Sequence, residues 1–299
     1  MFSIITPTFN REDTLHRVYD SLKEQTFKAF HWLIVDDAST DNTEDLVKSW
    51  IEEQPNMKID YRKLDENKGK PFALNYGLDF CTEPITIIAD SDDSFEPNTL
   101  SELKILWDMV DNTHNYEKIA TIWTLVKDEY GNVVGEKFPK NFWQVNFEQR
   151  VLKRKAKVKG EKWHSWRTSI LRQYKFFHND NTIHIGESAT WTKINQSYDF
   201  LCVNLVHRTY YHSPEGLINQ KKTSLKVAKI KYYTSFYQLK DISSVQLLKN
   251  RYYRYLAFEH IKSNIYYTDK KISLSIGKKI ICVIPFITVS VEKILSRVI

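Results

Sequence analysis

Three carboxylates lie within four positions of the stretch ADSDDSF, residues 89–95, directly after the apolar run ITII. Asp90, Asp92 and Asp93 supply oxygen ligands of the kind that Mg²⁺ and Mn²⁺ prefer, and such ions keep positions open for substrate phosphates. Asp and Ser also end strands as ordinary turn residues, because their side chains bond to nearby backbone. The cluster therefore indicates either a metal-bound phosphate ligand or a turn, and the rest of the chain decides between them.

The sequence lacks the other common phosphate and metal motifs. Neither GxxxxGK[ST] nor GxGxxG occurs, so phosphoryl transfer of the P-loop or kinase type is not expected. Cys81, Cys202 and Cys282 are far apart without CxxC spacing, which favours neither a disulfide framework nor a zinc site. A composition of 42% hydrophobic and 27% charged residues is typical of a globular protein and excludes a disordered or fibrous chain.

The first hundred residues repeat a unit of apolar strand, turn and helix. Strands are predicted at residues 2–9, 31–39, 58–64 and 84–90, and helices from Asn10, at 41–53 and at 71–80. Such alternation predicts a largely parallel sheet with helices on both faces, and ligands bind at the carboxyl ends of its strands. The Asp90 cluster, Asp36 with Asp37, and residues 6–9 all fall at predicted strand ends. Their side chains should converge on one rim, which favours a binding site over a turn.

The regular alternation fades after about residue 95. A helix at 96–110, a strand at 118–128, a hairpin turn at Gly131 and Asn132 and a β-like segment at 198–212 are predicted, followed by basic, aromatic helices. The chain has no internal repeat beyond the strand and helix units and no low-complexity linker.

Five motifs occur in the order and spacing of the bacterial family 2 glycosyltransferases: TPTFNR (6–11), VDDASTDNT (35–43), ENKGKPFALNYGL (66–78), ADSDDSF (89–95) and IGES (185–188). The chain resembles an inverting enzyme of the GT-A fold, strongly over residues 2–110 and more loosely over 161–217. The resemblance implies an α/β sheet of the GT-A type with helices on both faces. Residues 1–110 would form its nucleotide-sugar-binding half and 111–217 its acceptor-binding half. The basic, aromatic pattern of 218–299, and not the resemblance, predicts a C-terminal helical extension there.

The resemblance implies a nucleotide-sugar site at the strand ends. Thr6 and Phe9 correspond to the loop beside the base of the donor, and Lys70 lies in the segment that lines the nucleotide pocket. Asp37 corresponds to the residue that accepts a hydrogen bond from a uracil-like imide, whereas Asp36 would be a structural cap. A UDP-sugar is therefore the expected donor, with thymidine and guanine as alternative bases.

The same resemblance assigns the acidic cluster. Asp90 is suited to the ribose and Asp92 to the metal, and Asp93 would share the metal or hold the turn. The expected ion is Mn²⁺ or Mg²⁺, because a bound cation stabilises the charge that develops on the leaving diphosphate.

An inverting transfer needs one base that removes the proton of the acceptor hydroxyl, and Glu187 falls where the family places this base. Many members read Glu-Asp, whereas this chain has Glu187 followed by Ser188. If the second position carries the proton in those relatives, Ser188 cannot replace it. Asp180 and Asp199 are therefore the reserve candidates.

Aromatic and histidine side chains add weaker candidates. Trp163, His164 and Trp166 could stack on an acceptor sugar, and burial in the core is the alternative. His207 and His212 could complete a metal shell, although their segment is more typical of a strand and its turn.

The C-terminal third carries most of the positive charge. From residue 216 onward the chain has 16 Lys and Arg against 4 Asp and Glu. The apolar run at 280–291 is too short to span a bilayer but could lie in its interface, with lysines toward anionic head groups. A solvated helical face is the alternative, and no motif indicates nucleic acid. With no signal peptide indicated in MFSIITPTFN, we expect a cytoplasmic protein, peripheral on the inner face of the plasma membrane.

The sequence thus predicts a metal-dependent hexosyl- or N-acetylhexosaminyltransferase. It would act on a saccharide or lipid-linked saccharide in the biosynthesis of a surface polysaccharide such as capsule or lipopolysaccharide O-antigen. Two other classes stay open. A nucleotidyltransferase would usually show a Gly-rich basic loop after its first strand, where this chain has TPTFNRED. A catalytically silent glycan-binding or scaffold relative is the other, and Ser188 is its best support.

Overall fold

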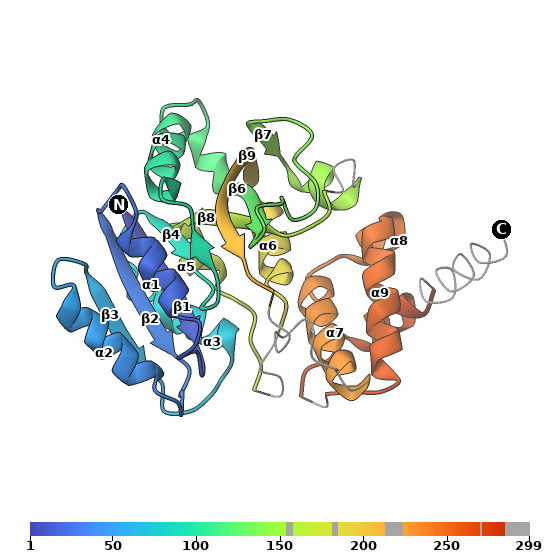
Figure 1. Ribbon diagram of the computed structural model, residues 1–299. Coiled ribbons are helices and arrows are strands. Elements are labelled where there is room, and N and C mark those ends of the chain that lie inside the picture. Colours follow the sequence, from blue (N-terminus) through green and yellow to red (C-terminus); the bar gives the residue numbers. More distant parts are fainter. Residues whose placement is uncertain (154–157, 181–184, 213–223, 270, 285–299) are drawn as a thin grey trace.

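The computed structural model describes residues 1–153, 158–180, 185–212, 224–269 and 271–284. Within these residues the protein has an α/β fold built on a nine-stranded mixed sheet, with a helical region beside it (Figure 1). The strand order is β3-β2-β1-β4-β8-β6-β9-β5, and β7 pairs with β9 off this path.

The first four strands of this order are parallel, as the sequence predicts. They are β1 (Phe2–Thr8), β2 (Phe30–Asp36), β3 (Ile59–Lys63) and β4 (Ile85–Ile88). The helices between them are α1 (His16–Lys23), α2 (Thr43–Glu53) and α3 (Lys70–Leu78). Helix α1 begins six residues after the predicted Asn10, whose φ of 50° is left-handed and does not continue into a helix.

The second half of the sheet contains antiparallel pairs that the sequence analysis did not predict. Its strands are β5 (Ser94–Phe95), β6 (Ile119–Asp128), β7 (Trp143–Val145), β8 (Lys162–Arg167) and β9 (Asp199–Tyr210). Strand β8 inserts between β4 and β6 and is antiparallel to both, whereas β6 and β9 are parallel. The remaining elements here are α4 (Thr99–Asp111), η1 (Tyr116–Lys118), the π-helix η2 (Glu148–Leu152), α5 (Thr168–Tyr174) and α6 (Ser188–Asn195).

Helices cover both faces of the sheet, so the sheet separates two hydrophobic cores. Alternate residues of β1 point to opposite faces, with Ile4 in one core and Ile5 in the other. Helices α1, α2 and α4 close the first core, and α3, α5 and α6 close the second. All three cysteines are buried free thiols. The polar residues of the strand ends therefore lie on a rim that two packed cores hold in place.

The C-terminal helices form a smaller unit against α6. They are α7 (Ser224–Leu239), α8 (Ser244–Lys249) and α9 (Arg251–Asn264), and they share their own hydrophobic cluster. A capping box starts α8, in which Ser243 and Gln246 bond to each other's backbone amides. In the part of the chain that the structure describes, no helix is long and apolar enough to cross a membrane. Most of the apolar run at 280–291 lies outside the described residues.

Candidate functional site

The loop that enters α3 is anchored by the carboxylate of Asp37 at the end of β2. Its two oxygens accept hydrogen bonds from the backbone amides of Lys68, at 2.8 Å, and Gly69, at 2.7 Å. Gly69 has a φ of 88°, which a side chain would make costly, and Pro71 follows in the first turn of α3. Burial raises the pKa of Asp37, although the two amides act in the opposite direction. The anchored loop fixes where α3, and therefore Lys70, begins.

Lys70 joins two carboxylates that are far apart in the sequence. Its Nζ lies 2.5 Å from Oδ1 of Asp90, at the end of β4, and 2.7 Å from Oε1 of Glu187, at the start of α6. Burial alone would lower the pKa of Lys70, but the charges of Asp90 and Glu187 outweigh it and raise that pKa. Lys70 therefore stays charged. It holds Asp90, the residue expected to bind the ribose, beside Glu187, the candidate base.

Arg208, on β9, is the second cation of this group. It pairs with Asp90 at 3.4 Å, with Asp93 at 3.0 Å and with Glu161 at 2.6 Å. Burial opposes ionisation of Asp90, yet Lys70 and Arg208 together lower its pKa to about 2. Burial raises the pKa of Asp93, and the neighbouring carboxylates add to that effect. The cluster ADSDD is thus part of an ion-pair network and not an isolated turn.

The network carries more acid than base, which bears on metal binding. Four carboxylates pair here with two cations, Lys70 and Arg208; they are those of Asp90, Asp93, Glu161 and Glu187. A fifth carboxylate, that of Asp92, acts on Asp93. Asp92 forms no ion pair with the described residues, and its backbone carbonyl accepts a hydrogen bond from Arg17. No group of three or more His, Cys, Asp or Glu side chains in the described ranges forms a ready metal cage. The surplus of negative charge fits an ion that takes one or two carboxylates and completes its shell with phosphate oxygens.

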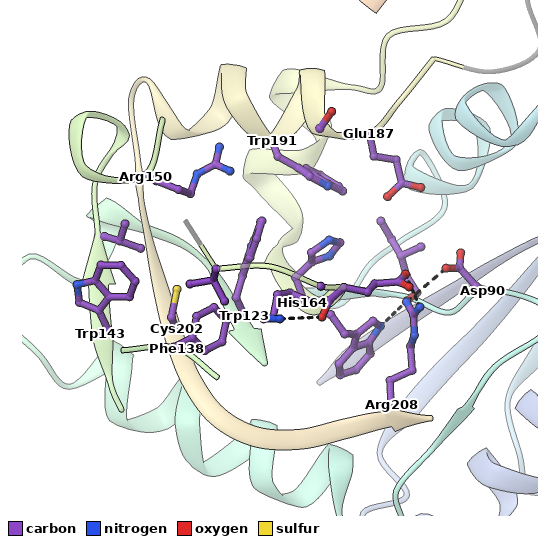
Figure 2. Close-up of a pocket in the computed structure, with 18 of the residues that line it drawn as sticks. Asp90, Trp123, Phe138, Trp143, Arg150, His164, Glu187, Trp191, Cys202 and Arg208 are labelled. Carbon is purple, nitrogen blue, oxygen red and sulfur yellow. Dashed lines mark hydrogen bonds and ion pairs between the residues drawn. The ribbon is translucent and has the colours of Figure 1, made fainter. Parts of the chain in front are cut away.

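A cavity of about 590 Å³ opens beside this network (Figure 2). Its charged end is lined by Lys70, Asp90, Glu161, Glu187 and Arg208. The opposite, aromatic end is lined by Trp123, Phe138, Trp143, Arg150 and Cys202. Figure 2 shows Arg150, Trp143 and Cys202 well away from Asp90 and Arg208, with His164 between the two groups. The cavity can therefore hold a ligand that meets charge at one end and ring faces at the other.

The three residues predicted to contact the acceptor sugar differ in whether they line the cavity. Trp163 and His164 line the cavity, whereas Trp166 is fully buried, does not line it, and stacks on Trp191 with ring centroids 4.3 Å apart. Trp166 therefore presents no face to a ligand in this arrangement. It donates to Nδ1 of His164 at 2.9 Å, and burial together with the charge of Arg208 lowers the pKa of His164 to about 3. His164 is neutral at physiological pH.

Of the three carboxylates considered as base, Glu187 lines the cavity and the other two do not. Asp180 is exposed, and Asp199 accepts a hydrogen bond from Gln144. The two histidines considered as metal ligands are paired elsewhere, His207 with Glu102 and His212 with Glu129. Ser188, the departure from the Glu-Asp pattern, lines the cavity beside Glu187.

The residues assigned to the base of the donor lie at the end of β1. Phe9 is 41% exposed and is open to contact, whereas Thr6 is fully buried and accepts a hydrogen bond from Trp32 at 2.8 Å. Asp36 accepts bonds from the amide of Ser39 and the hydroxyl of Tyr61, which matches its expected role as a cap. Thr6 can therefore shape the end of β1 but does not face solvent.

Several residues of the site were not predicted from the sequence, above all Arg208. A lone arginine in the apolar segment 198–212 was a usable signal, because a buried charge is seldom left without partners. The aromatic end was missed as well, since Trp123, Trp143 and Arg150 come from separate elements that β9 and α6 bring together.

Comparison with known proteins gives a family match and a longer alignment. Residues 3–108 match the family model described as Glycosyl transferase family 2. Over 269 residues the chain is 23% identical to the GalNAc(5)-diNAcBac-PP-undecaprenol beta-1,3-glucosyltransferase of Campylobacter jejuni, which covers 89% of this chain and 82% of that protein. Three other curated relatives are matched over only 28% to 40% of their own length.

Solved structures share the fold. S. aureus TarS 1-349 in complex with UDP-GlcNAc superposes with a TM-score of 0.62 at 17% identity, over 88% of this chain and 71% of that one. The mannosyltransferase PcManGT from Pyrobaculum calidifontis, in complex with GDP-Man and Mn²⁺, gives a TM-score of 0.55 at 18% identity, over 89% and 73%. The sheet with its flanking helices is thus the GT-A fold.

Proposed function

Given that the chain belongs, through residues 3–108, to family 2 of the glycosyltransferases with the GT-A fold, we propose that it is a metal-dependent inverting enzyme. It transfers a hexosyl or N-acetylhexosaminyl group from a UDP-sugar to a saccharide or lipid-linked saccharide of a surface polysaccharide. The observation that carries this proposal is the bridge from Asp90 through Lys70 to Glu187. It joins the donor side of the site to the candidate base in one cavity.

The named relatives support the choice of substrates. TarS is solved with UDP and with UDP-GlcNAc, PcManGT binds GDP-Man with Mn²⁺, and the Campylobacter protein is named for a saccharide linked to undecaprenol by a diphosphate. Two of these three names carry a nucleoside diphosphate, one of uracil, which has an imide N–H, and one of guanine, whose N1–H is a lactam. Uridine is our preference because the Asp37 position suits an imide.

The donor would bind along the rim formed by the ends of β1, β2 and β4. A carboxylate offers about four lone-pair sites, so Asp37 can accept a bond from the base in addition to its two backbone amides. Phe9 supplies an exposed ring beside the base, and Asp90 supplies oxygens for the ribose. Thr6 contributes by holding Trp32 and the end of β1 in place.

Asp92 with Asp93 would hold the divalent cation. When bound, that ion lowers the energy of the negative charge that develops on the diphosphate as the glycosidic bond breaks. Lys70 and Arg208 add fixed positive charge to the same region. These two cations also keep Asp90 ionised, so that its oxygens remain hydrogen-bond acceptors.

Glu187 acts as the general base of a single in-line displacement. Its carboxylate lines the cavity and would accept the proton of the acceptor hydroxyl as that oxygen attacks the anomeric carbon. The ion pair with Lys70 at 2.7 Å orients the carboxylate toward the cavity before the acceptor arrives. Ser188, which cannot remove a proton in this way, leaves Glu187 as the base.

The test is a calorimetric titration of the intact protein with UDP-, dTDP-, GDP- and CMP-sugars, each with Mn²⁺ and again with EDTA. We expect one UDP-sugar to bind in the presence of the metal and to lose most of its affinity in EDTA. The variant Asp92→Ala should lose the metal-dependent part of the affinity for the UDP-sugar. The variant Asp45→Ala, which removes an exposed carboxylate on α2, should keep it. A folded protein that binds none of the sugars would favour a silent scaffold and overturn the proposal.

The basic region 218–299 is proposed to hold the enzyme against an anionic membrane surface. Its charge of 16 basic against 4 acidic residues from residue 216 onward supports this, since each Lys or Arg near such a surface adds about 1 kcal/mol of attraction. Sedimentation with anionic and with neutral vesicles tests it. Equal binding to both would contradict an electrostatic anchor.

A further inference from the structure

The cations that line the cavity fall into two classes. Lys70 and Arg208, at the charged end, pair with all three carboxylates of the lining, Asp90, Glu161 and Glu187. The other two lining cations, Arg150 and Lys162, form no ion pair with a carboxylate in the described part of the chain. The cavity therefore contains positive charge that its own residues leave uncompensated.

Arg150 is held in position without being neutralised. Its Nε donates to Oδ1 of Asn195 at 2.7 Å, and its guanidinium lies 5.5 Å from the ring centroid of Trp123 and 4.9 Å from that of Phe200. Its Nη2 is buried and has no hydrogen-bond partner among the described residues. Burial lowers the pKa of Arg150 to about 10, which shows how little opposite charge surrounds it. A buried donor without a partner is costly, and a bound anion would remove that cost.

Lys162 lies at the same end of the cavity. Among the described residues, its Nζ donates to two backbone carbonyls, those of Lys159 and Glu161, each at 3.0 Å. Burial lowers its pKa as well, although Glu136 and Glu161 partly offset this. The Nζ of Lys162 lies 5.8 Å from the ring centroid of Phe138, which lines this end of the cavity together with Arg150 and Cys202. Two cations without carboxylate partners at one end of the cavity favour a negatively charged ligand group there.

Aromatic side chains flank Cys202 at this end of the cavity. Cys202 on β9 is in register with Trp123 on β6 and with Trp143 on β7, so the two tryptophans lie on either side of it. The indole Nε1 of Trp123 is also buried without a partner in the described residues. Ring faces with a few hydrogen-bond donors are typical of a pocket for a cyclic polar ligand such as a sugar.

We propose that this end of the cavity binds an anionic group, a carboxylate or a phosphate, carried by the saccharide acceptor, with Arg150 as the principal contact and Lys162 as the second. The inference rests on the proposed function. In an in-line displacement the acceptor approaches the anomeric carbon from the side opposite to the diphosphate. The donor diphosphate would bind at the Asp90 end. The acceptor would therefore bind at the end that holds Arg150 (Figure 2).

The test compares three glycosides that share one ring: methyl glucoside, methyl glucuronide and methyl glucoside 6-phosphate. Their binding to the intact protein, saturated with UDP and Mn²⁺, is followed by tryptophan fluorescence or ligand-observed NMR. We expect at least one of the two anionic glycosides to bind about tenfold more tightly than the neutral one, because charge-assisted bonds are the stronger ones. The better of the two identifies carboxylate or phosphate, and added salt should reduce the preference.

The variant Arg150→Gln should remove the preference, and Arg150→Lys should keep part of it, because a lysine retains the charge but not the two-pronged geometry. Arg251→Gln, an exposed arginine on α9, is the matched control. The dissociation constant of UDP, measured in each variant, reports on folding and on the donor site. If a variant fails to fold, the comparison of glycosides and its salt dependence in the unchanged protein still decide the question.

Equal binding of the three glycosides, or no binding of any of them, by a protein that binds UDP would overturn the anion subsite. A preference that survives Arg150→Gln would also overturn it. The two proposals fail separately. If UDP does not bind but the anionic preference is present and depends on Arg150, the donor assignment is wrong and the anion subsite is supported.

Discussion

The two ends of the cavity differ in how they compensate charge. At the charged end, Lys70 and Arg208 pair with every carboxylate of the lining, so the side chains hold one another in place before any ligand arrives. At the aromatic end, Arg150 is oriented by Asn195 and by rings, and no carboxylate neutralises it in the described residues. The side chains of the charged end are thus held in a fixed arrangement by their own ion pairs. At the aromatic end, the charge of Arg150 would be neutralised by a bound ligand.

This difference gives the two arginines, Arg208 and Arg150, different roles. Removing a cation from the charged end leaves buried carboxylates unpaired, which costs stability. Removing a cation from the aromatic end leaves no described carboxylate unpaired. The effect should therefore appear as weaker ligand binding. Four predictions test this contrast.

The largest effect should follow Glu187→Gln, which removes the proposed base while keeping the size of the side chain. We expect kcat to fall about 10²- to 10⁴-fold, because a general base contributes that much. Binding of the UDP-sugar should change little, since the base acts on the acceptor. Asp180→Asn is the control, because Asp180 is exposed and does not line the cavity. A similar loss from Asp180→Asn would transfer the role of base to that residue.

Arg208→Met and Arg150→Met compare the two ends by stability. Arg208 pairs with Asp90, Asp93 and Glu161, so its removal should lower the free energy of unfolding by about 3–5 kcal/mol. Arg150→Met leaves no unpaired carboxylate among the described residues but removes the donor to the buried Oδ1 of Asn195, and should cost about 1–2 kcal/mol. Urea unfolding at neutral pH measures both. Equal losses in the two variants would show that the ends do not differ in charge compensation.

Acidification should act through His164, between the two ends. Burial and the charge of Arg208 lower its pKa in the folded protein to about 3, against an ordinary value near 6.5. Below pH 6.5 the unfolded chain binds a proton that the folded protein does not, so stability falls as pH decreases toward 3. The contribution at pH 4 is about 3 kcal/mol.

The variant His164→Asn isolates this contribution, because Asn keeps an oxygen that can accept from Trp166. Urea unfolding of both proteins between pH 7 and pH 4 gives the two slopes. The unchanged protein should lose more stability than the variant over this interval. Parallel curves would mean that His164 takes up its proton in the folded protein and that the positive surroundings are not felt there.

The smallest effect should follow Trp143→Ala at the aromatic end. A stacked ring contributes about 1 kcal/mol, so we expect the preferred anionic glycoside to bind about five- to tenfold more weakly while UDP binding is unchanged. Phe142→Ala, a neighbouring ring that is half exposed and does not line the cavity, is the control. A loss of UDP affinity in Trp143→Ala would mean that the two ends are not separate subsites.

The elements that carry the charged end were largely predictable. Strands β1 to β4 and helices α2 and α3 occur where apolar periodicity and turn residues placed them, because those signals are local. The position of Asp37, Asp90 and the neighbouring carboxylates at strand ends follows from the same pattern. Strand β8 was not predicted, since KWHSWR has no alternation that separates a buried strand from any other short polar and aromatic run.

The sequence by itself determined which side chains reach the rim of the sheet and that the last third of the chain is basic. Tertiary structure alone decided which charges meet. The partners of Arg208 include Asp90 and Glu161, 118 and 47 positions away, and Arg150 meets Asn195 across 45 positions. A local pattern can place a residue on a strand or helix, but the distance between two charges depends on how distant elements pack. For that reason the division of one cavity into a compensated and an uncompensated end became visible only in the fold.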